Sequence, residues 1–91
     1  MPYISMEKRE TLDHSITSLT YRILAHDEGE RAGMLNYTIS SLLSGLSKEE
    51  GVNYRNINCM IGVLECAKLE LYRRLACPYE DEKMQSNGDV Y

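Results

Sequence analysis

The chain has 91 residues, of which 14 are acidic and 10 basic, giving a formal net charge of −4. A domain of this length buries only about 60% of the surface of its unfolded chain, so it is marginal as a monomer without disulfides, metals or self-association. The sequence has no basic stripe with interleaved aromatic residues, so we do not expect a nucleic-acid duplex as a partner. No apolar run approaches the roughly 18 residues of a membrane-spanning helix.

The cysteines predict neither a metal site nor a disulfide framework. Cys59, Cys66 and Cys77 contain no C-x-x-C pair, and the two histidines lie far from them in sequence. Cys59 and Cys66 are about 10 Å apart along one predicted helix, too far to bridge each other. We therefore expect reduced thiols in a cytosolic protein, with no metal and no cofactor. Self-association is then the remaining source of stability.

The first predicted helix spans residues 6–27. Ser5 is its expected N-cap, and Asp27 to Gly29 are expected to end it. Its apolar residues recur at steps of four, three and four, which is the spacing of a narrow stripe that packs on another helix. These residues are Leu12, Ile16, Leu19 and Ile23.

The second predicted helix spans residues 33–48, with a start between Glu30 and Met34 that Gly33 leaves open. Gly51, followed by Val52, is typical of a glycine-terminated helix end. The apolar face of this helix comprises Leu35, Ile39, Leu42, Leu43 and Leu46.

The third predicted helix spans residues 53–77, with Asn53 as its N-cap. Pro78 is expected to stop or kink it, or to begin a short acidic helix within the tail, residues 78–91. The sequence thus predicts an all-α fold in which three main helices form a small bundle. We expect a single helical domain over residues 1–91, completed by oligomerisation and followed by a short acidic C-terminal segment.

The third helix has apolar residues on two sides. One side is expected to pack on the first two helices through Ile57, Ile61, Leu64, Leu71 and Leu75. A helix that is apolar nearly all round is buried nearly all round, so the second side indicates a subunit interface. The alternative is that the tail folds back over it. This interface set is Cys59, Gly62, Val63, Cys66 and Leu69.

Lys68 interrupts the apolar side of the same helix. A buried ammonium group must be paired, reach water or face a ligand, so two interpretations stay open: a structural ion pair, for instance with Glu65, or a polar ligand beside the helix. Arg73 and Arg74 suit a helix C-terminus, yet arginine beside tyrosine is also a common phosphate grip. The candidate ligand-binding residues are Tyr54, Asn58, Glu65, Lys68, Tyr72, Arg73, Arg74 and Tyr79.

No catalytic motif is present: the sequence has no glycine-rich phosphate loop, no G-x-S-x-G and no H-E-x-x-H. The Glu80-Asp81-Glu82 run is expected to be solvated, because consecutive side chains point in different directions. We therefore expect a protein that is not an enzyme.

Several motifs of the chain carry a resemblance to known sequences: Met1-Pro-Tyr-Ile4, Leu35-Asn-Tyr-Thr-Ile39, Tyr54-Arg-Asn-Ile-Asn58, Gly62-Val-Leu-Glu-Cys-Ala-Lys-Leu-Glu-Leu-Tyr-Arg-Arg74, Pro78-Tyr-Glu-Asp81 and Asn87-Gly-Asp-Val-Tyr91. In these motifs the chain resembles a family of small uncharacterised proteins of tailed bacteriophages. The resemblance implies a viral origin and a location in the host bacterial cytoplasm, and it assigns no functional residue.

Small phage proteins without catalytic residues usually act by binding. The expected function is therefore counter-defence, by sequestering a nucleotide signal of the host or by blocking a host protein. The alternatives are a minor structural or assembly factor and a small nucleotide hydrolase. The expected partners are further copies of the chain and either a small anionic, nucleotide-like ligand or a host protein.

Overall fold

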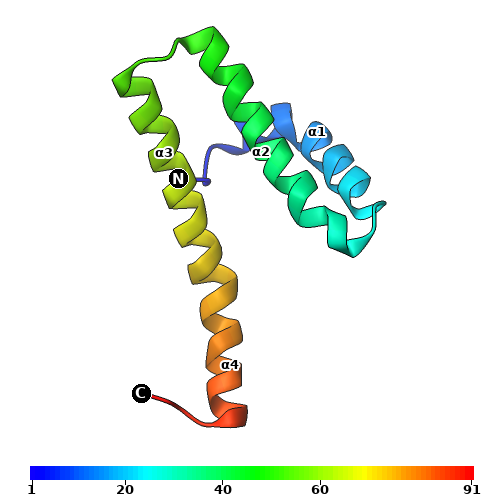
Figure 1. Cartoon of the computed structure of the whole chain (residues 1–91), viewed down its shortest axis with the longest axis vertical. Helices are drawn as coiled ribbons and strands as arrows, with labels where there is room; N and C mark the ends of the chain where they lie inside the picture. The colour runs from blue at the N-terminus through cyan, green and yellow to red at the C-terminus, as the bar shows by residue number, and fades with distance from the viewer. The chain divides into compact units, whose positions relative to one another are not determined.

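The computed structural model describes all residues, 1–91, and is all-α, as the sequence predicts (Figure 1). The chain divides into two compact units, which are described separately. The hairpin unit comprises residues 3–57, and the long-helix unit comprises residues 58–91 with residues 1–2.

Helix α1, Met6–Leu24, opens the hairpin unit. The Ser5 side chain accepts a hydrogen bond from the backbone N–H of Lys8 at 3.4 Å, as expected of an N-cap. Arg9, in the first turn of α1, donates through its Nε to the carbonyl of Ile4, which lies just before the helix, at 2.9 Å. Local hydrogen bonds therefore fix the start of α1, and the Ser5 cap among them is predicted by the sequence.

The turn after α1 is held by Arg31, which reaches back from the next helix. Its guanidinium donates to the carbonyl oxygen of Leu24 at 3.1 Å and to that of His26 at 3.2 Å. These carbonyls lie at the C-terminal end of α1, where a cation is favoured and acceptors lack helical partners. Because these acceptors are satisfied there, α1 ends at Leu24, three residues before the predicted end at residue 27.

Helix α2, Glu28–Glu50, begins five residues earlier than predicted. Gly29 was expected to end the preceding helix, and Gly33 left the start of this one open, but both glycines lie within α2. Glu28 and Glu30 occupy its first turn, where negative side chains are stabilised by the helix dipole.

The α2–α3 turn is built from three residues with distinct roles. Gly51 ends α2 with φ +97°, and the Asn53 side chain accepts from the backbone N–H of Asn56 at 2.9 Å. The Asn56 amide donates to the carbonyls of Glu50 and Gly51 at 3.1 and 3.0 Å. The predicted glycine end and the Asn53 N-cap are both present.

The long-helix unit contains most of α3, Tyr54–Leu71, a π-helical turn η1, Tyr72–Ala76, and α4, Cys77–Asn87. Figure 1 shows them as one continuous helix. Pro78 does not stop the helix. The Cys77 N–H bonds the Tyr72 carbonyl five residues back, and this wider turn accommodates a proline that lacks an N–H and crowds the carbonyl four residues earlier.

Neither unit contains a buried side chain. The apolar residues that the sequence assigns to a core are exposed or half-buried throughout, including the α1 stripe and the apolar sides of α3. None of the helices is long and apolar enough to span a bilayer.

Candidate functional site

The predicted ligand-binding residues lie along α3, η1 and α4, on an open helix surface. Lys68, which was expected to need a partner because of burial, has 69% of its side chain exposed. Its Nζ lies 3.1 Å from a carboxylate oxygen of Glu65, one turn earlier. The pair is thus a solvated i,i+3 ion pair, which contributes little to stability because water screens it. Lys68 was open to two interpretations, a structural ion pair or a ligand contact, and the structure provides the partner for the ion pair.

The π turn separates Tyr79 from the rest of the set. A single π turn shifts the helical phase by about one residue, roughly 100°. Tyr72 therefore shares a shallow hollow of about 520 Å³ with Glu80 and Asp81, while Tyr79 lies outside that hollow. Tyr79 instead has Lys83 Nζ 5.5 Å from its ring centroid. In the lining of the hollow beside Tyr72, the carboxylates of Glu80, Asp81 and Asp89 outnumber the single cation, Lys83, which disfavours an anion at this end of the helix.

The two arginines of η1 differ in their contacts. Arg73 forms a bidentate pair with Glu70, one turn earlier in the same helix. The Arg74 side chain makes no hydrogen bond or ion pair within the chain. Arg74 is therefore the cation of this segment that is available to an outside anion.

The predicted interface side of α3 is uncovered in the chain. Val63 is 64% exposed, and a Cβ added at Gly62 would meet no atom within 4 Å. Cys59 and Cys66 are exposed free thiols, and Leu69 is also exposed. Nothing within the single chain accounts for a helical glycine at position 62, which costs about 0.5–1 kcal/mol relative to alanine.

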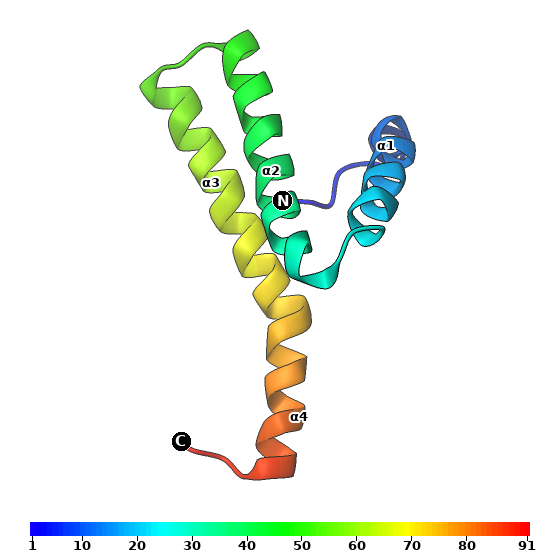
Figure 2. The same ribbon diagram turned by 45° about the vertical axis from the view of Figure 1, so that its right-hand side comes forward.

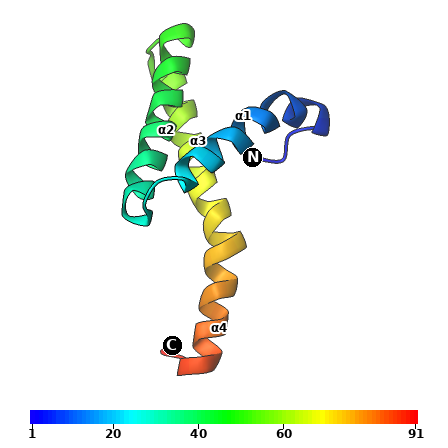
Figure 3. The ribbon, with the colours of Figure 1, turned by 90° about the vertical axis from the view of Figure 1, so that its right-hand side faces the viewer.

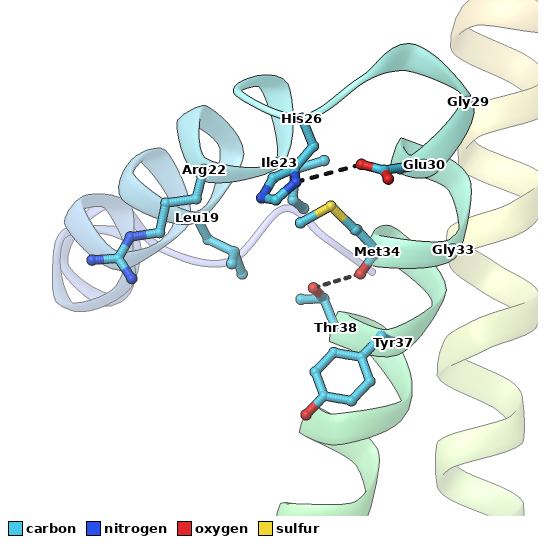
Figure 4. Close-up of a pocket in the computed structure, with 10 residues that line it drawn as sticks. All are labelled: Leu19, Arg22, Ile23, His26, Gly29, Glu30, Gly33, Met34, Tyr37 and Thr38. Atoms are coloured by element: carbon cyan, nitrogen blue, oxygen red, sulfur yellow. Dashed lines mark hydrogen bonds and ion pairs between the residues drawn. The ribbon is translucent and has the colours of Figure 1, made fainter.

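A groove that the sequence does not predict lies between α1 and α2 and has a volume of about 640 Å³ (Figure 4). Leu19, Ile23 and Met34 form its apolar part, and Figure 4 shows Thr38 and Tyr37 projecting toward it from α2. At the turn, His26 Nδ1 lies 3.5 Å from a Glu30 carboxylate oxygen. Only the angle between the two helices creates this groove, so no local sequence pattern could reveal it.

The groove and the exposed side of α3 both carry side chains that can bind a ligand or another chain. The groove presents an apolar floor with polar groups at its edge, a composition common among sites for ligands and for amphipathic segments. No group of three or more His, Cys, Asp or Glu side chains is placed to hold a metal ion.

The family profile described as "Domain of unknown function (DUF6899)" matches residues 1–90. The chain belongs to this family. No curated protein and no solved structure matches the chain. The DUF6899 match covers residues of both units.

Proposed function

We propose that this protein is a small, non-enzymatic binding protein that acts as a homo-oligomer. Its proposed role is counter-defence in a phage-infected bacterium, and its resemblance to tailed-phage proteins supplies that setting. One observation carries the binding proposal: the chain has well-formed helices but no buried side chain. Apolar helix faces that remain exposed favour association with other chains.

Between the two proposed targets, the side-chain contacts favour blocking a host protein over sequestering a nucleotide signal. Lys68 and Arg73 are already paired with carboxylates, and acidic residues outnumber basic ones in the hollow beside Tyr72. A nucleotide would have to compete with these carboxylates for its phosphate contacts. An apolar helix face needs no such exchange, because it gains free energy by leaving water.

One observation supports the nucleotide alternative: the Arg74 side chain has no intrachain partner. A guanidinium group can donate two parallel hydrogen bonds to the oxygens of one phosphate. In an oligomer, Arg74 and Lys68 from two subunits would face one ligand. The proposed ligand site therefore comprises Lys68 and Arg74, and the proposed subunit interface is the Cys59–Gly62–Cys66–Leu69 side of α3.

Native mass spectrometry of the full chain, purified from infected bacteria, tests the proposal. We expect an oligomer that retains a host protein in fixed stoichiometry. Leu69→Glu should release that protein or break the oligomer, whereas Ser86→Glu on α4 should do neither.

Three other results would overturn specific parts. A retained nucleotide without a host protein would replace protein blocking by sequestration. Conversion of an added nucleotide panel to products would refute the non-enzymatic assignment. Stoichiometric recovery in purified virions would identify a structural factor instead.

A further inference from the structure

The apolar stripe of α1 continues beyond the point where α1 packs against α2. Beside the turn, Ile23 and Met34 are half-buried at the groove. Farther from the turn the two helices diverge, as Figures 2 and 3 show. Leu12 and Ile16 are consequently 50% and 57% exposed, although they belong to the same stripe as Ile23.

The exposed area of the chain is larger than a folded monomer leaves in water. The accessible surface is 8334 Å². A folded monomer of this mass, 10.4 kDa, exposes about 5400 Å², so roughly 2900 Å² remain to be covered. Two copies of the chain together carry about 5800 Å² of such surface, and obligate homodimers bury about 2000–5000 Å² over both partners, so a dimer contact can cover a large part of it.

The spacing of the α1 stripe is self-complementary. Its residues, Leu12, Ile16, Leu19 and Ile23, are separated by four, three and four positions, so the pattern reads the same in both directions. Two antiparallel copies of α1 would therefore place Leu12 opposite the second copy's Ile23, and Ile16 opposite its Leu19. A two-fold contact requires this reciprocity, since each patch must fit itself.

The groove provides room for such a contact. Ile23, Gly29 and Gly33 all line the groove, and a Cβ added at either glycine would meet nothing within 4 Å. The N-terminal half of a second α1, with its Leu12, would enter the groove at this point. The α1 stripe is thus half of a core that a second copy completes.

We propose that two copies of this chain dock through their α1 helices, antiparallel, around a two-fold axis between Thr17 and Ser18. The N-terminal half of each α1 fills the α1–α2 groove of the other copy, which produces a four-helix core from two hairpins. This surface is separate from the α3 interface of the proposed function and does not depend on any host target.

The test compares two substitutions at neighbouring positions of α1 in the full chain. Ile16→Glu places a carboxylate in the proposed core, whereas Thr17→Glu places the same charge on the other side of the helix. The molar mass is measured by light scattering over a range of concentrations. We expect Ile16→Glu to raise the dissociation constant about 100-fold or more, and Thr17→Glu to leave it within about threefold.

Crosslinking determines the orientation and remains informative if Ile16→Glu fails to fold. Leu12→Cys and Ile23→Cys are made separately in a background with serine at the three native cysteine positions, and are then mixed. An antiparallel pair predicts a disulfide from position 12 to position 23 in the mixture and little in either variant alone. Disulfides within each separate variant would instead show parallel packing and overturn the proposal.

A wild-type monomer at micromolar concentration, with a melting temperature independent of concentration, would overturn it too, because the chain would then cover its stripe by itself. Loss of the oligomer in Gly62→Leu but not in Ile16→Glu would leave the α3 interface standing and refute this one.

Discussion

Gly51 ends α2 in a backbone conformation that a side chain strains. Its φ of +97° and ψ of 147° lie in a region that is essentially restricted to glycine. A Cβ at this position would meet only the Asn53 amide nitrogen, at 3.9 Å, which is an ordinary contact. The cost of Gly51→Ala therefore comes from the backbone alone, and it amounts to about 1–3 kcal/mol.

Gly45 provides a matched control on the same helix. It has helical geometry, and an added Cβ meets nothing within 4 Å. Gly45→Ala should therefore stabilise the protein by about 0.5–1 kcal/mol, because alanine loses less backbone entropy on folding. The same added methyl group is thus expected to have opposite effects at two positions six residues apart.

Urea denaturation curves of the two variants and the wild type are recorded at one chain concentration, with circular dichroism at 222 nm as the measure of unfolding. For small proteins the free energy of unfolding falls by about 1–3 kcal/mol per M urea, so a loss of 1 kcal/mol lowers the unfolding midpoint by roughly 0.3–1 M, which makes the contrast measurable. If Gly51→Ala unfolds at the same urea concentration as the wild type, or at a higher one, the turn geometry described above is wrong.

Three further substitutions test the turn, the ion pair and the α3 surface. Asn56→Ala removes both hydrogen bonds to the end of α2 and should cost about 1–2 kcal/mol in the same assay, whereas no loss would show that water replaces them. Lys68→Met should change the free energy of unfolding by less than about 0.5 kcal/mol, because its pair with Glu65 is solvated, and a larger loss would mean that Lys68 is buried in an assembly. A side chain added at Gly62 meets no atom within 4 Å in the single chain. If Gly62→Leu nevertheless lowers the melting temperature and shifts the protein to lower mass in sedimentation, a partner packs against α3; an unchanged mass would exclude such a partner.

Local patterns in the sequence determined the helical elements of this protein. The Ser5 and Asn53 caps, the glycine at position 51 and the apolar periodicities act within one or two turns of chain, so they are visible without tertiary information. The same reasoning placed Glu65 beside Lys68, because residues three apart on a helix are neighbours.

Contacts between elements decided the rest. The early end of α1 depends on Arg31, whose guanidinium returns from α2 to carbonyls seven and five residues earlier. The displacement of Tyr79 from Tyr72 has a local cause instead: the π turn beside Pro78 shifts the helical phase, whereas sequence periodicity assumes a constant one. The groove exists only because α1 and α2 diverge, and helix divergence is set by packing between helices rather than by either helix alone.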